Sequence, residues 1–132
     1  MKVIEFQTRK KLEIVDITDK VEQFVAESKI KEGHLVVSAL HATLAIIVNE
    51  NENRLLDDIR QTITNLISDN KHYAHNEGQD NNATAHLRSI LLGHSQTFII
   101  NEGRLVLGTW QRIMAVELDG PRQRKVVLSI RN

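Results

Sequence analysis

The order of hydrophobic and polar residues along the chain is mostly that of short β-strands. Residues 3–6 and 12–17 are strand-like and lie on either side of a basic turn at residues 8–11, which predicts two opening strands. Later strands are predicted at residues 34–40, 43–48, 97–100, 104–107, 112–118 and 125–130. Residues 101–103 and 119–121 supply the Asn, Asp, Gly and Pro residues that favour turns between the last of these strands.

A first, short helix is predicted between the opening strands and Gly33. Asp19 is the expected N-cap residue, and Glu22, three positions later, would complete a capping box. The residues expected to face the protein interior are Val21, Phe24 and Val25. Gly33 is expected to mark the exit from this helix.

Two later segments have the 3.6-residue period of amphipathic helices. In residues 53–68 the apolar stripe consists of Leu55, Leu56, Ile59, Ile63, Leu66 and Ile67. In residues 83–92 the expected inward stripe consists of Ala83, Leu87, Ile90 and Leu91. Gly93 is the expected end of this second helix.

Residues 69–82, between these two helices, are rich in Asn, Asp, His and Gly. We expect a polar loop there, and a loop of about this length without structure of its own is often functional in a compact domain. Many strands with two to three helices predict an α+β fold with largely antiparallel sheets. A single domain covering residues 1–132 is expected.

The composition narrows the class of protein further. Hydrophobic residues make up 41% and charged residues 26%, as in soluble globular proteins. Seventeen basic residues balance 17 acidic ones, so charge gives no argument for nucleic-acid binding. The absence of cysteine excludes disulfides, thiol catalysis and thiolate metal sites. No apolar run approaches the roughly 20 residues that span a membrane, and no signal-peptide core is present, so a cytoplasmic location is predicted.

Residues 41–50 are the first candidate for chemistry. Alternate residues of a strand share one face. The polar set is His41, Thr43 and Asn49, and the apolar set on the other face is Leu44, Ile46 and Val48. This pattern fits a strand that carries site groups at its ends, and it also fits a half-exposed strand with ordinary surface polar residues.

Residues 72–86 contain three histidines together with several Asn, Asp and Glu residues. On the following helix, Asn82, His86 and Ser89 are neighbours because they are three or four positions apart. Neutral imidazoles with a carboxylate can hold a divalent metal, and protonated imidazoles can bind phosphate. The spacing matches no zinc motif with two histidines on one helical turn, and solvated loop histidines are the alternative.

Two further segments are candidates. Gly108 in residues 103–111 is expected to mark a bulge or a close approach of the backbone. Trp110, the one tryptophan, suits either a core or interface position or a substrate platform. Arg122 and Arg124 follow a rigid turn at residues 119–121 and are able to grip a phosphate by forked hydrogen bonds. A solvated hairpin tip explains the same arginines.

These segments together resemble a known family. The motifs, in order, are His41-x-Thr43-x-Ala45 with Asn49-Glu50, Tyr73-x-His75, Asp80-x-Asn82-x-x-Ala85-His86-Leu87 continuing to Leu91-Leu92-Gly93, Gly103-x-Leu105-x-Leu107-Gly108-Thr109-Trp110-Gln111, Glu117, and Asp119-Gly120-Pro121-Arg122-x-Arg124. In this order they cover nearly the whole chain and resemble the secondary thiamine-phosphate synthase family, also called the YjbQ-like family. Ala42 and Asn81 depart from its pattern, which usually has Thr and Asp there, and the loss of a carboxylate at Asn81 would weaken metal binding.

The resemblance implies a sandwich-like α+β domain that assembles as a homotrimer, with its site near the subunit contacts. It also implies a secondary activity that joins a pyrimidine pyrophosphate to a thiazole phosphate with loss of pyrophosphate. Two alternatives remain open. One is a non-catalytic homotrimer that binds a metal or small ligand, and the other is a structural protein whose polar cluster lies in a subunit contact.

We derive the following site from the residues and the resemblance. His41, His75 and His86 are expected to form one catalytic cluster that binds phosphate or, with Asp80, a divalent metal such as Mg or Zn. Glu117 is expected to act as a base or as a supporting group. The residues expected to bind a phosphorylated small-molecule substrate or another anion are Thr43, Asn49, Asn82, Arg122 and Arg124.

Overall fold

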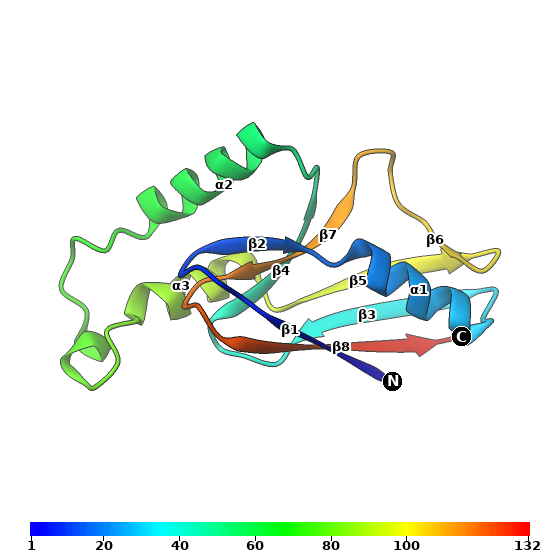
Figure 1. The fold of residues 1–132 in the computed structure, drawn as a ribbon, viewed down its shortest axis with the longest axis horizontal. Helices are drawn as coiled ribbons and strands as arrows, with labels where there is room; N and C mark the ends of the chain where they lie inside the picture. The colour runs from blue at the N-terminus through cyan, green and yellow to red at the C-terminus, as the bar shows by residue number, and fades with distance from the viewer.

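Two antiparallel sheets lie face to face in the computed structural model, which describes all 132 residues (Figure 1). The larger sheet has the strand order β1-β8-β3-β5-β6, and the smaller has the order β2-β7-β4. Every strand pair is antiparallel. The predicted single-domain α+β fold with antiparallel sheets is therefore confirmed.

The predicted strands are present with small changes at their ends. They are β1 (Lys2–Gln7), β2 (Glu13–Asp16), β3 (Gly33–Ala39), β4 (Leu44–Asn49), β5 (Ser95–Asn101), β6 (Arg104–Leu105), β7 (Arg112–Glu117) and β8 (Gln123–Arg131). The largest differences are in β6, which is only two residues long, and in residues 41–43, which form a turn before β4. The assumed continuous strand over residues 41–49 was therefore wrong, and so was the shared face derived from it.

The helical segments are α1 (Thr18–Ser28), α2 (Asn53–Leu66), the 3₁₀ helix η1 (Ala74–Glu77) and α3 (Ala83–Leu92). The helices at 53–68 and 83–92 are confirmed, whereas η1 adds a turn of structure to the loop that was expected to have none. No helix is both long and apolar enough to cross a membrane.

Hydrophobic residues from both sheets form the main core. Leu35, Val37 and Leu128 of the larger sheet pack in one cluster with Ile46 and Ile113 of the smaller sheet. α1 adds Val21 and Val25 to the same cluster, as predicted. A second cluster lies on the other face of the smaller sheet, where α2 and α3 cover β4 and β7. The smaller sheet is therefore buried on both faces, and it supplies the rigid support for α3.

The start of α1 differs from the prediction. Asp19 lies inside the helix. The N-cap residue is Ile17, and no side chain caps the start of the helix there. Instead, Asp16 accepts a hydrogen bond from the backbone N–H of Thr18 at 2.9 Å. Burial alone raises the pKa of Asp16, but hydrogen bonds from Arg112, Thr18 and Asn51 outweigh it and lower the pKa to about 2. The end was also misplaced, because α1 ends at Lys29 in a left-handed conformation and Gly33 starts β3.

The inward face of α3 also differs from the prediction. Ala83 is buried as expected, but Leu87, Ile90 and Leu91 are exposed by 39%, 77% and 56%. The buried face instead contains Arg88, whose guanidinium donates to the carbonyl of Ile67 at 2.7 Å. The inward side of this helix therefore combines small apolar residues with hydrogen-bonded polar side chains, and an apolar strip stays in contact with solvent.

Candidate functional site

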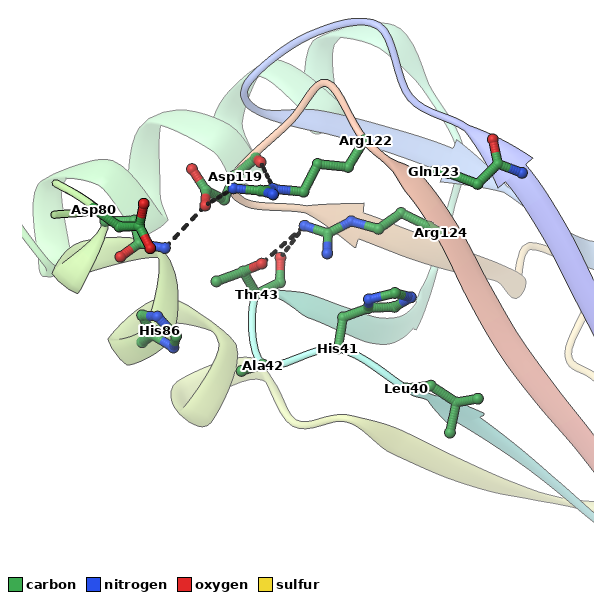
Figure 2. Close-up of a pocket in the computed structure, with 11 residues that line it drawn as sticks. Leu40, His41, Ala42, Thr43, Asp80, His86, Asp119, Arg122, Gln123 and Arg124 are labelled. Carbon is green, nitrogen blue, oxygen red and sulfur yellow. Dashed lines mark hydrogen bonds and ion pairs between the residues drawn. The ribbon is translucent and has the colours of Figure 1, made fainter.

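An open cavity of about 690 Å³ lies where α3 approaches the turn before β4 and the start of β8 (Figure 2). Only Leu40 and Ala42 among its lining residues are hydrophobic. The polar lining consists of His41, Thr43, Asp80, Asn82, His86, Asp119, Arg122, Gln123 and Arg124. Residues far apart in the sequence, from the segments 41–43, 80–86 and 119–124, thus form one polar cavity.

A buried ion pair between Arg124 and Glu117 forms the floor of this cavity. Arg124 is 2% exposed and Glu117 is fully buried. The Arg124 Nε donates to Glu117 Oε1 at 2.7 Å, and its Nη2 donates to Glu117 Oε2 in a second, short contact. Nη2 also donates to the hydroxyl of Thr43 at 2.8 Å. This two-point contact fixes the plane of the guanidinium, as forked arginine–carboxylate pairs do.

Glu117 has no free acceptor facing the cavity. Its Oε1 accepts from the Thr8 hydroxyl at 2.7 Å, and its Oε2 accepts from the backbone N–H of Asp119 at 3.0 Å. Burial alone raises the pKa of Glu117, but hydrogen bonds from Arg124, Thr8 and Asp119 lower it below its usual value. Of the two roles expected for Glu117, its position beneath the cavity favours the supporting one.

A chain of hydrogen bonds runs along one wall of the cavity. Arg122 Nη2 donates to Asp119 Oδ2 at 3.0 Å, and the Asn82 amide donates to the same oxygen at 2.9 Å. Asn82 Oδ1 then faces His75 Nε2 at 2.9 Å. Because Asn82 donates to a carboxylate, its oxygen must face His75, and His75 therefore carries a proton on Nε2.

Two of the three predicted histidines line the main cavity, and the third lies in a neighbouring pocket. His41 and His86 both line the cavity, whereas His75 lies on η1 and lines a separate pocket with Tyr73 and Leu87. The His75 and His86 rings meet edge to face with centroids 4.8 Å apart. His86 thus connects the two pockets, and His75 influences the main cavity through Asn82 and His86.

The arrangement of donor atoms does not fit the expected metal cluster. No group of three or more His, Asp or Glu side chains is placed to hold a metal ion. His41 Nε2 accepts a hydrogen bond from the backbone N–H of Lys125 at 2.9 Å, and His75 Nε2 donates to Asn82. Neither Nε2 atom has a free lone pair for a metal, although a neutral His75 ring keeps one on Nδ1.

Most of the predicted binding residues lie together, and one does not. Thr43, Asn82, Arg122 and Arg124 line the cavity. Asn49 is at the opposite end of β4, where it pairs with Arg112 and its side chain accepts from the backbone N–H of Glu50. Thr43 and Asn49 lie at opposite ends of β4, and because an extended strand rises roughly 3.3 Å per residue, sharing a strand face does not bring them to one site.

Thr8, Asp119 and Gln123 belong to the site but were not predicted. The Thr8 hydroxyl accepts from the backbone N–H of Arg122 at 2.9 Å and so joins the β1–β2 turn to the cavity wall. No local signal marks Thr8, because its partners are more than a hundred residues away. Asp119 and Gln123 adjoin the two predicted arginines in the sequence, so the same motif pointed to them.

The fold and the cavity define a single-domain α+β sandwich with a polar, arginine-containing cavity at one end. The model of the family described as "UPF0047 protein YjbQ-like" matches residues 2–132. The chain therefore belongs to the YjbQ-like UPF0047 family, as the sequence motifs predicted.

Relatives with similar sequences and structures agree with this assignment. A UPF0047 protein of Methanothermobacter thermautotrophicus is 44% identical over 94% of this chain and 86% of its own length. The UPF0047 protein YugU of Bacillus subtilis is 35% identical over 94% of this chain and 93% of its own length. A crystal structure from Sulfolobus solfataricus, described as a YbjQ-like protein of unknown function, has a TM-score of 0.95 at 43% identity and covers 98% of this chain and 94% of its own.

Proposed function

We propose that the cavity binds phosphorylated small molecules and that the protein transfers, as a secondary activity, a pyrimidinylmethyl group from its pyrophosphate to a thiazole phosphate. The observation that carries the proposal is the buried guanidinium of Arg124 in the floor of a polar cavity, with Arg122 in its wall. Arginines in a cavity of this size suit phosphate esters, because each can donate several hydrogen bonds to phosphate oxygens.

The proposed transfer requires positive charge rather than a base. The bond between the methylene carbon and the pyrophosphate oxygen breaks, and its electron pair leaves with pyrophosphate. The ring nitrogen of the thiazole supplies the electron pair for the new carbon–nitrogen bond, so no proton is transferred. Arginines that hold the pyrophosphate would stabilise the charge that develops as it leaves. A buried and fully paired Glu117 is compatible with this reaction.

Arg122→Ala is expected to lower kcat/KM for the transfer about tenfold or more, since it removes a charge-assisted hydrogen bond. Arg122 is exposed, so the variant should still fold, although it loses the ion pair with Asp119. Product formation and pyrophosphate release measure the reaction, and Arg54→Ala on α2, with a side chain 92% exposed, is the matched control.

Failure to form product from any pyrimidine and thiazole pair, with or without Mg²⁺ or Zn²⁺, would contradict the transfer. Ligand binding without turnover would favour a non-catalytic binding protein. Metal analysis of the purified protein tests the metal expectation separately, because no step proposed here uses a metal held by the histidines.

We further propose that three copies associate through the uncovered apolar surface beside the cavity. Leu40 and Ile90 line a second hollow, which shares His41 and His86 with the main cavity. Leu40 is 54% exposed and Ile90 is 77% exposed. The outer face of the larger sheet also exposes Val36 and Ile99. Exposed apolar surface of this kind is typical of interfaces, and the number three comes from the family resemblance. We also propose that the protein acts in the cytoplasm, as the sequence predicted.

Ile90→Glu is expected to dissociate the trimer, because a charge would be buried without a partner in the contact. Light scattering should give three times the monomer mass for the unaltered protein and a smaller mass for the variant. Leu66→Glu at the end of α2, where the side chain is 64% exposed, is the control and should leave the mass unchanged. A monomeric unaltered protein would contradict the assembly.

A further inference from the structure

Arg124 has hydrogen-bond donors that the protein does not use. Its Nε and Nη2 contact Glu117, and Nη2 also contacts the carbonyl and hydroxyl of Thr43 at 3.2 and 2.8 Å. Nη1 makes no hydrogen bond within the chain, although the side chain is 2% exposed and lines the cavity. No buried side-chain nitrogen or oxygen lacks a hydrogen-bond partner, so Nη1 must be open to the cavity, where its two N–H groups are available to a ligand.

His41 supplies a second donor of known position. The backbone N–H of Lys125 can only donate, so His41 Nε2, at 2.9 Å, must be the acceptor. A neutral imidazole that accepts at one ring nitrogen carries its proton on the other, which here is Nδ1. Burial, followed by the positive charge of Arg124, lowers the pKa of His41 and favours this neutral form. His41 and Arg124 line the same cavity, and the imidazole ring lies beside the guanidinium (Figure 2).

We propose that Arg124 Nη1 and His41 Nδ1–H form a subsite that binds one phosphate group directly, without a metal ion on His41. The inference deepens the proposed function, because it names the protein groups that would hold a phosphate of the substrate. It differs from the expected metal cluster, since His41 acts as a hydrogen-bond donor and not as a metal ligand.

The remaining charges around the subsite favour a phosphate over a carboxylate. A planar carboxylate pairs best with a two-pronged edge of the guanidinium, and Glu117 already occupies the edge formed by Nε and Nη2. Single donors from separate directions suit a tetrahedral oxyanion better. The charge of Asp119 is balanced by Arg122, and Asn82 donates a hydrogen bond to the same carboxylate. Asp80 lies toward the opposite side of the cavity from Arg124 (Figure 2).

The tautomer of His41 can be tested without any ligand. Long-range ¹⁵N–¹H NMR correlations of the imidazole should show a proton on Nδ1 and a lone pair on Nε2 near pH 7.5. Inorganic phosphate, added in the presence of a metal chelator, should then shift the His41 ring signals in a saturable way. A proton on Nε2, or a phosphate response that requires added Zn²⁺ or Mg²⁺, would overturn the proposal.

A pair of variants tests the donor itself. In His41→Asn the amide nitrogen can take the place of Nδ1, whereas in His41→Gln it reaches the place of Nε2. Phosphate affinity by calorimetry should stay within about threefold for His41→Asn and fall about tenfold or more for His41→Gln, as expected for one hydrogen bond to a charged group. The reverse order would overturn the subsite. Phosphate binding as expected, with no transfer activity, would reject the proposed reaction and keep the subsite.

Discussion

Glu117→Gln is expected to lower the free energy of unfolding by roughly 3–5 kcal/mol, the cost of breaking a buried ion pair by removing one partner. The guanidinium of Arg124 would stay charged and 2% exposed while its counter-charge is lost. Both oxygens of Glu117 accept hydrogen bonds in the folded protein. The NH₂ group of the new glutamine, itself a donor, would therefore face other hydrogen-bond donors. Urea denaturation, analysed by linear extrapolation, measures the change.

The double variant Glu117→Leu with Arg124→Met separates stability from binding. Replacing a buried ion pair by apolar residues of similar volume is often neutral or stabilising, so this variant should be more stable than Glu117→Gln. It should nevertheless show no phosphate binding, because the unpaired donors of Arg124 are gone. An unfolding free energy of Glu117→Gln within about 1 kcal/mol of the unaltered protein would show that the pair does not anchor the cavity floor.

The strands and helices could be predicted from the sequence because each depends on residues that are near one another in the chain. The strand patterns of β3 and β7 indicate buried faces regardless of their partners. The predicted stripe of α2 is confirmed in part, since Leu56 and Ile63 are buried but Leu66 is 64% exposed. α3 shows where this reasoning fails. Its hydrophobic pattern indicated the wrong inward face, because Arg88 and Ser89 find acceptors at Ile67 and Leu44 in distant segments.

The candidate site was predictable to a similar extent. The family motifs identified Thr43, Asn82, Arg122 and Arg124, and the structure places them around one cavity. What the sequence could not provide was the distribution of protons and partners among the side chains. The roles of His41 and Glu117 follow from single contacts, with the N–H of Lys125 and with Arg124, that exist only after folding.

Gly120→Ala is expected to destabilise the protein by at least the roughly 1–3 kcal/mol typical of overpacked sites. An added Cβ atom would collide with the backbone carbonyl of Lys10, and it would lie 2.8 Å from Glu117 Cγ and 3.0 Å from the Thr8 hydroxyl. The backbone cannot yield easily, since Gly120 donates to the carbonyl of Lys11 at 3.0 Å. The β1–β2 turn must therefore move away from the cavity floor, which should weaken phosphate binding as well.

Gly78→Ala is the matched control for this substitution. Its added Cβ atom would lie 3.5 Å from the carbonyl of His75, an ordinary contact, and its backbone has a negative φ of −83°. Stability should change by no more than about 0.5 kcal/mol, as for most surface substitutions. Equal unfolding free energies for the two variants would show that the turn at Lys10 accommodates a side chain. The cavity floor would then depend on the pairing of Glu117 with Arg124 and not on the close contact of the two loops at Gly120.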